Sequence, residues 1–273
     1  MSASFKIENG VITDSYCSGE KHLEIPSTDQ SGNPVTEIRH LNESTICREF
    51  TSVSIPNSIK VIGEGVFSCS QLSRIEIPAS VEHIAEGFAA YSPLTEIVVD
   101  PKNRYYESPN GCNAIIDKRT HTLIQGCVNT IIPEGVQVIG KSAFQGCGFR
   151  FKGFRSVVLP ESVTKISQAA FYDCANLEQI LIPKGVTEIG KSAFSDCGRL
   201  KTILLPDGLK SIGQQAFENN DDLEYIRIPE AKLEKDVFFY VLNPKIVIAT
   251  TPAMASMLKK DYADLLRDAT FVC

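Results

Sequence analysis

Histidine, cysteine and clustered carboxylates are the residues of this chain best suited to metal binding, acid–base or nucleophilic chemistry. The four histidines are dispersed along the sequence: His22, His40, His83 and His121. None of them has the spacing of a metal-binding pair or of a catalytic triad. The densest acid–base group is His83 with Glu82 and Glu86, at variable positions of a loop. We therefore expect no metal site, no cofactor and no enzymatic activity.

The nine cysteines include no Cys-x-x-Cys pair, which is unfavourable to both a structural zinc site and a disulfide framework. Three of them, Cys147, Cys174 and Cys197, occupy one position of the repeat described below, where a small apolar side chain is expected to pack inward. The candidates for a more reactive thiol lie off that register: Cys17, Cys112, Cys127 and Cys273. Free thiols favour a reducing compartment.

The composition excludes several other classes of function. Of the 273 residues, 43% are hydrophobic and 22% are charged, which predicts a folded protein with its own core. The net charge is −6 and no block of like charges occurs, so we expect no binding to nucleic acid or to an anionic membrane. The longest apolar runs, such as residues 97–99, are far shorter than the roughly 18 residues that span a bilayer. No membrane span is therefore expected.

A repeat organises the whole sequence. An Ile-Pro or Leu-Pro dipeptide recurs, and the steps from Pro160 to Pro183, Pro206 and Pro229 are each 23 residues. The segment Leu-x-x-Ile-x-Ile before each proline alternates with period two, which predicts a short strand that the proline ends. A return path follows, with a glycine that suits a turn or a close backbone approach. Phenylalanine recurs eleven positions after the proline: Phe67, Phe144, Phe171, Phe194 and Phe217.

One repeat cannot fold alone. Its roughly eight buried side chains, at about 1.5–3 kcal/mol each, do not offset an ordering cost of about 1–2 kcal/mol for every residue. Repeats must therefore stack, and equivalent residues then form continuous columns of isoleucine, phenylalanine and cysteine in a shared core.

The repeat Leu-x-x-Ile-x-Ile-Pro-x-x-Val-x-x-Ile-Gly-x-x-Ala-Phe-x-x-Cys closely resembles that of the BspA-like leucine-rich repeat family, over about residues 23–248. The resemblance implies an α/β (mostly β) repeat solenoid, a right-handed leucine-rich-repeat horseshoe with a parallel sheet on its concave side. Many members of that family are bacterial or protist surface proteins that bind host extracellular-matrix proteins or other cells. Other members are uncharacterised and lack export signals.

We expect a single leucine-rich-repeat domain over residues 1–273, with an N-terminal hairpin cap (1–22), repeats (23–249) and a C-terminal cap helix (250–273). Surplus residues at about 102–126 contain Asn110-Gly111 and the apolar segments 114–116 and 123–124, which predict an inserted β-hairpin. A second insertion, around residues 149–152, mixes aromatic and basic side chains. It suits either a small contact site for an anionic or carbohydrate partner or a plain loop.

The candidate binding residues come from the strand position between the two isoleucines, which points away from the core. From residue 98 to residue 204 this position is aliphatic in every repeat: Val98, Ile131, Val158, Leu181 and Leu204. Polar positions flank this stripe or continue it: Arg155, Gln179, Lys201, Tyr225 and Arg227. An exposed apolar stripe of about 20 Å would mark an interface. Alternatively, these residues are present only because they favour strands.

Recognition of a protein is the function that these features favour, through a non-catalytic scaffold. The resemblance implies an adhesin-type module at the cell surface or secreted, with a host or extracellular-matrix protein as partner. The alternative is an intracellular scaffold or regulator that binds a cytosolic protein. The free thiols favour this alternative, as do the first ten residues, which lack the pattern of a secretory leader. The location would be cytoplasmic if that N-terminus is native.

Overall fold

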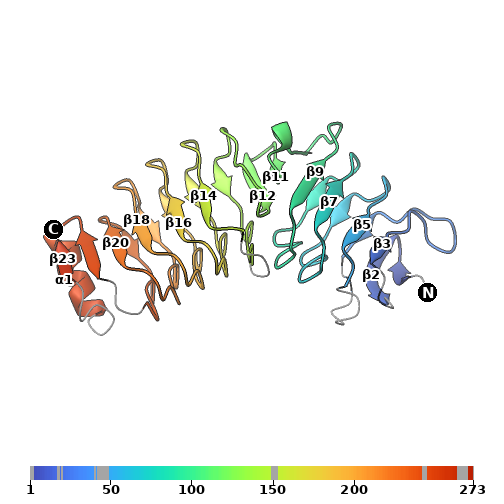
Figure 1. Cartoon of the computed structure of the whole chain (residues 1–273). Helices are drawn as coiled ribbons and strands as arrows, with labels where there is room; N and C mark the ends of the chain where they lie inside the picture. Colours follow the sequence, from blue (N-terminus) through green and yellow to red (C-terminus); the bar gives the residue numbers. More distant parts are fainter. Residues whose placement is uncertain are drawn as a thin grey trace. The chain divides into compact units, whose positions relative to one another are not determined.

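The computed structural model describes residues 3–16, 19, 21–39, 41, 49–148, 153–241, 245–262 and 270–272. These parts are mostly β-structure, with one α-helix among the described residues, and successive turns of the chain stack strand on strand (Figure 1). The expected leucine-rich-repeat solenoid is therefore confirmed. The chain divides into two compact units, Met1–Ile131 (unit 1) and Ile132–Cys273 (unit 2). The organisation as a single domain stays a prediction.

Unit 1 begins with an antiparallel pair, β1 (Ser4–Glu8) and β2 (Val11–Tyr16). Parallel strands then follow β2 in the order β4 (Glu37–Ile38), β6 (Val61–Ile62) and β8 (His83–Ile84). Two further parallel pairs are β3 (His22–Glu24) with β5 (Ser52–Ser54), and β7 (Arg74–Ile77) with β9 (Glu96–Val99). Each repeat thus contributes to two rows of strands.

The inserted segment of unit 1 forms β10 (Tyr106–Glu107), a short 3₁₀ turn η2 (Pro109–Gly111), β11 (Ala114–Asp117) and β12 (Thr122–Gly126). Strand β11 pairs antiparallel with both β10 and β12. The tight turn between β11 and β12 is residues 118–121, where His121 has φ 52°. Asn110-Gly111 lies in η2, in the connection between the antiparallel strands β10 and β11, and both residues have positive φ, at 53° and 66°.

An ion pair anchors this hairpin. The Arg119 side chain donates to both carboxylate oxygens of the buried Asp117, at 2.9 and 2.6 Å, and to the Tyr106 hydroxyl at 3.3 Å. The Tyr106 hydroxyl in turn accepts the amide of Ile84 in β8 at 2.9 Å. Burial raises the pKa of Asp117, but the hydrogen bonds and charge of Arg119 outweigh it, so the pKa lies below its ordinary value.

We expect Arg119→Ala to lower the free energy of unfolding by about 1–3 kcal/mol at neutral pH, because it leaves a buried carboxylate without its main partner. Since the folded-state pKa of Asp117 is lowered, its stabilisation is present above the unfolded value of about 3.9 and is lost as the pH falls through the folded value. The deficit of the variant should therefore shrink below about pH 4. Urea denaturation over a pH series measures both effects.

Arg104→Ala is the matched control, because Arg104 is an exposed arginine of the same inserted segment. We expect it to change the free energy of unfolding by less than about 0.5 kcal/mol. Equal losses in the two variants, or a deficit of Arg119→Ala that does not depend on pH, would contradict the role assigned to the ion pair.

Unit 2 is the more regular part of the array. One parallel sheet runs in the order β14 (Ser156–Val158), β16 (Gln179–Leu181), β18 (Thr202–Leu204), β20 (Tyr225–Ile228), β22 (Ile246–Ala249) and β23 (Thr270–Val272). A second row of parallel strands contains β13 (Val138–Ile139), β15 (Lys165–Ile166), β17 (Glu188–Ile189), β19 (Ser211–Ile212) and β21 (Lys232–Leu233). The sequence predicts only one strand per repeat, because a two-residue strand is too short to show an alternating pattern.

The phenylalanine column forms the centre of the core in unit 2. The rings of Phe144, Phe171, Phe194, Phe217 and Phe238 are buried and stack with centroids 5.1–5.6 Å apart and nearly parallel planes. This confirms the expected column. In unit 1 the contacts are edge-to-face instead, at 6.2 and 6.3 Å along residues 50, 67 and 88. The spacing of repeats is less regular there, so successive rings do not meet in one orientation.

The side chain at the cysteine position of the repeat is small and buried, and it also donates a hydrogen bond to the backbone. The thiols of Cys174 and Cys197 donate to the backbone carbonyls of Phe144 and Phe171, at 3.1 and 3.2 Å. Asn220 occupies the same position one repeat later, and its amide donates to the Phe194 carbonyl at 3.0 Å. A small side chain with a donor therefore fits this slot.

Two of the four off-register thiols, Cys112 and Cys127, do not have the reactive surroundings that the sequence suggests. Cys112 and Cys127 are buried, and burial raises the pKa of both thiols. Less thiolate is therefore present at neutral pH, which lowers reactivity. Their burial depends on the packing of the inserted hairpin, which register alone does not predict. Cys17 and Cys273 lie outside the described residues.

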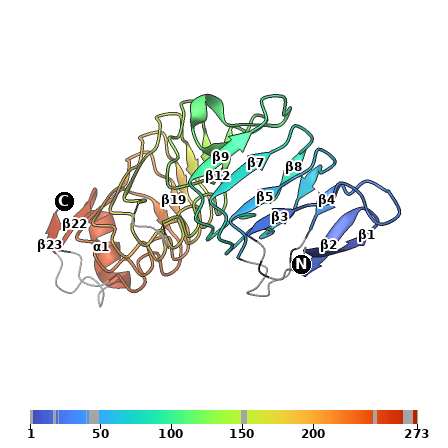
Figure 2. The ribbon, with the colours of Figure 1, turned by 45° about the vertical axis from the view of Figure 1, so that its right-hand side comes forward.

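Helix α1 (Pro252–Asp261) packs next to β22 at the C-terminal end of unit 2 (Figure 2). The Thr251 hydroxyl caps it by accepting the amide of Met254 at 3.2 Å, and Pro252 occupies the first turn. Met254 and Leu258 are buried, and Tyr262 meets the ring of Phe238 edge-on at 5.8 Å. The helix therefore covers the end of the phenylalanine column.

Candidate functional site

Three aliphatic side chains project from neighbouring strands of the unit 2 sheet. In β14, β16 and β18 the central residue points into the core, so the last residue of each strand points outward. These outward residues are Val158, Leu181 and Leu204, with exposed fractions of 68%, 68% and 51%. Large apolar side chains in adjacent strands are therefore left in contact with solvent.

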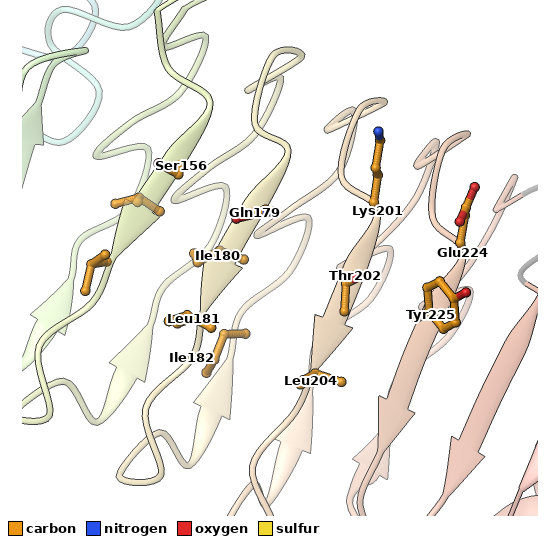
Figure 3. A pocket seen from close by; sticks show the side chains of 12 residues that line it. Ser156, Gln179, Ile180, Leu181, Ile182, Lys201, Thr202, Leu204, Glu224 and Tyr225 are labelled. Atoms are coloured by element: carbon orange, nitrogen blue, oxygen red, sulfur yellow. The ribbon is translucent and has the colours of Figure 1, made fainter.

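These side chains lie in an open groove of about 730 Å³ that crosses strands β14, β16, β18 and β20. Figure 3 shows Leu181 and Leu204 along it, with Lys201, Glu224 and Tyr225 at the end where the strands begin. Gln179 lines it from β16. The groove thus combines an apolar floor with polar groups along one side, which is the composition of a binding surface for another molecule.

The polar side of this groove carries a row of alternating charges. Residues that precede equivalent strand positions in successive repeats are Arg155, Glu178, Lys201, Glu224 and Lys245. Arg155 pairs with Glu178 at 3.4 Å, and Lys245 pairs with Glu224 at 2.8 Å. The hydrogen bond that Lys245 donates to the Glu224 carboxylate raises the pKa of Lys245. Lys201, between the two pairs, makes no ion pair with any residue that the structure describes.

Arg227 ends the row of aliphatic residues. It is the partner of Leu204 in the register between β18 and β20. Its guanidinium donates to the Leu205 carbonyl at 2.6 Å and forms an ion pair with Asp207. The side chain is therefore folded back onto the preceding repeat and borders the groove.

The structure brings together most, but not all, of the predicted binding residues. Six line the groove: Val158, Leu181, Leu204, Gln179, Lys201 and Tyr225. Arg155 and Arg227 do not line it: Arg155 pairs with Glu178 in the row of charges, and Arg227 is the strand partner of Leu204.

The other two candidates belong to unit 1. Val98 is half-buried in β9. Ile131 is 75% exposed but lies in a connecting segment, not in a strand, where its amide donates to the Cys112 carbonyl. Its expected place in a strand was therefore wrong, because the inserted hairpin takes the place of that strand. The insertion at residues 149–152 lies outside the described residues.

Unit 1 has a second groove, of about 460 Å³, that the sequence analysis missed. Its lining is polar and includes His22, Ser52, Ser54, Arg74 and Glu76. These residues also stand at outward strand positions. The sequence contains a signal for this groove, because the outward strand residue is polar in the early repeats and aliphatic in the later ones.

A hydrogen-bonded group of side chains in this second groove has the residue types of a catalytic triad. The His22 ring nitrogens lie 2.9 Å from the Ser52 hydroxyl and 3.2 Å from Glu24, and the Ser54 hydroxyl lies 3.0 Å from the ring. The side chains of His22 and Glu24 are 50% and 75% exposed. Catalytic groups usually lie in an enclosed pocket, not open to solvent. We therefore interpret these hydrogen-bonded side chains as a polar network at the surface.

The part of the chain that the structure describes contains neither a metal site nor a membrane-spanning helix. No group of three or more His, Cys, Asp or Glu side chains is placed to hold a metal ion there. No helix in the same residues has the length and apolar character needed to cross a membrane.

Comparisons with known proteins identify the family. The sequence profile of the "BspA type Leucine rich repeat region" matches in 6 copies, over residues 16–109 and 116–244. No curated protein matches.

Solved structures share the fold at low sequence identity. A leucine rich cell surface protein from Faecalibacterium prausnitzii A2-165 is 18% identical, with a TM-score of 0.63 over 93% of this chain and 95% of that one. The pneumococcal vaccine antigen PcpA is 15% identical, with a TM-score of 0.58 over 98% and 95%. A leucine-rich repeat protein from Eubacterium ventriosum ATCC 27560 is 20% identical, with a TM-score of 0.55 over 77% and 66%. The chain belongs to the BspA-type leucine-rich repeat family.

Proposed function

We propose that the chain is a non-catalytic protein-binding module whose unit 2 groove holds a protein partner. The observation that carries this proposal is the exposure of Val158, Leu181 and Leu204 in one groove. Exposing three large aliphatic side chains in adjacent strands costs free energy that burial by a partner would recover, at about 25 cal/mol per Å² of apolar surface. Polar groups along one side give such a contact its orientation.

The proposed setting is recognition at the cell surface, of the adhesion type. Its support is the solved structure of a leucine rich cell surface protein that has the same fold. The alternative is an intracellular scaffold or regulator. Its support is that the cysteines the structure describes are free: Cys69, Cys112, Cys127, Cys147, Cys174 and Cys197.

The test begins with capture of partners by the full chain from its native host, followed by titration calorimetry with each purified partner. We expect Leu181→Asp and Leu204→Asp to weaken binding at least tenfold, because a carboxylate would be desolvated at the centre of the interface. Both positions face solvent, so the melting temperature should be unchanged.

Tyr240→Asp is the control, since Tyr240 is an exposed aromatic residue of unit 2 that does not line the groove. We expect it to bind like the wild type. If Leu181→Asp and Leu204→Asp also retain wild-type affinity for every captured protein, the groove is not the binding site.

A further inference from the structure

The chemistry of the partner follows from the charges along the groove, an inference that rests on the proposed function. Two charged side chains line the groove itself, Lys201 and Glu224. Glu224 is already neutralised by Lys245 at 2.8 Å. On the other side of Lys201, Glu178 is engaged by Arg155 at 3.4 Å. The charge that the groove presents uncompensated is therefore that of the Lys201 ammonium group.

Lys201 lines the same groove as Leu204 and lies three residues before it in the sequence. Lys201 comes directly before β18, which contains Thr202 and Leu204. On the neighbouring strand β20, Tyr225 lies beside Thr202, and 40% of its surface is exposed. Figure 3 shows the Lys201 side chain extending from the start of β18, at one end of the groove. A molecule that covers Leu181 and Leu204 and continues along the groove toward the start of the strands, over about 10 Å, would meet the Lys201 ammonium group.

We propose that the occupant is a peptide segment of a protein partner in which a carboxylate side chain, Asp or Glu, borders apolar side chains. The apolar side chains cover Leu181 and Leu204, and the carboxylate pairs with Lys201. The three aliphatic residues span about 10 Å at a strand spacing of about 4.8 Å. About three residues of an extended segment are enough to cross them.

The groove of unit 1 has the opposite charge balance and is therefore unfavourable to an acidic peptide segment. Its lining and immediate edge carry four carboxylates, on Glu24, Glu76, Glu96 and Asp100, against one arginine, Arg74. Arg74 is held between Glu76 at 3.3 Å and Glu96 at 3.1 Å. An acidic segment would be repelled there by the surplus of carboxylates, so the two grooves differ in the charge that they would accept.

The test uses three fluorescein-labelled peptides with one core, x-Ser-Leu-Ser-Phe between Gly-Ser ends, in which x is Glu, Gln or Lys and lies on the same face of an extended segment as the two apolar side chains. Fluorescence anisotropy measures their binding to the full chain at low ionic strength. We expect the Glu peptide to bind about two- to fivefold more tightly than the Gln peptide, the range of an exposed ion pair. The Lys peptide should bind most weakly. The preference should fall as salt is added.

Variants of the protein distinguish the contribution of the Lys201 charge to peptide binding from that of the apolar groove. Lys201→Gln should equalise the Glu and Gln peptides, and Lys201→Glu should favour the Lys peptide. Lys210→Gln is the matched control, because Lys210 is exposed and does not line the groove; it should keep the wild-type order. Leu181→Asp should abolish binding of all three peptides.

Three results would overturn the inference, and they leave the proposed function to its own test. Equal binding of the three peptides that Leu181→Asp still abolishes would remove the acidic preference and leave the groove as a binding site. Binding that Leu181→Asp does not change would show that the peptides dock elsewhere. No binding up to about 1 mM, the weak end of the affinity scale, would show that a short segment is not what the groove recognises.

Discussion

Replacement of Phe194 by alanine is expected to lower the free energy of unfolding by about 3–5 kcal/mol. The ring is fully buried and stacks between Phe171 at 5.2 Å and Phe217 at 5.4 Å. Its removal loses the transfer free energy of an aromatic side chain and leaves a cavity that touches both neighbouring repeats. Because each repeat is stabilised by its neighbours, the loss spreads along the column. Urea denaturation followed by circular dichroism measures it.

Phe239→Ala provides the comparison within the same unit. Phe239 is 39% exposed, and its ring contacts that of Tyr240 at 4.1 Å, outside the buried column. We expect a change of about 0.5 kcal/mol or less. Similar losses for the two variants would mean that the column contributes no more to stability than a surface aromatic residue does.

Gly213→Ala is expected to destabilise by about 3 kcal/mol, the upper end of the cost of overpacking. A Cβ at Gly213 would lie 2.5 Å from the carbonyl carbon of Gly190 and would also meet the amide nitrogen of Lys191. Both are backbone atoms of the preceding repeat, so no side-chain rotation can relieve the clash. The Gly213 amide also donates to the Ile189 carbonyl at 2.8 Å, which fixes this close approach. Thermal and chemical denaturation would both report the loss.

Gly198→Ala tests whether the close approach, rather than glycine itself, is what matters. A Cβ at Gly198 would meet no heavy atom within 4 Å. We therefore expect a neutral change or a stabilisation of up to about 1 kcal/mol, because alanine restricts the unfolded chain. A loss at Gly198 equal to that at Gly213 would be inconsistent with the steric account.

The repeating features could be predicted from the sequence because one residue type recurs at one slot. Phe171, Phe194 and Phe217 all fall eleven positions after a proline, and all are buried. For the glycine after Ile212 the sequence left open a turn or a close backbone approach, and the contacts of Gly213 decide for the close approach. Periodicity therefore predicts the core well wherever the 23-residue spacing is kept.

The irregular features could not be predicted, because they depend on contacts that are specific to one place. Asn110-Gly111 lies in the connection between β10 and β11, yet the second tight turn, at residues 118–121, contains no such turn dipeptide. Cys112 and Cys127 are buried by the packing of the same insertion. In the candidate site, strand alternation predicted that Leu181 and Leu204 point outward. Which charges pair along the row depends on distances between neighbouring strands, which the sequence does not contain.

The alternating charges of Arg155, Glu178, Lys201, Glu224 and Lys245 restrict how such an array can grow. Equivalent residues of neighbouring repeats lie side by side in the parallel register of the sheet. Duplication of a single 23-residue turn would place two like charges next to each other and cost stability. Duplication of two turns together preserves the alternation. Gene duplications that lengthen this part of the protein should therefore be tolerated best in even numbers.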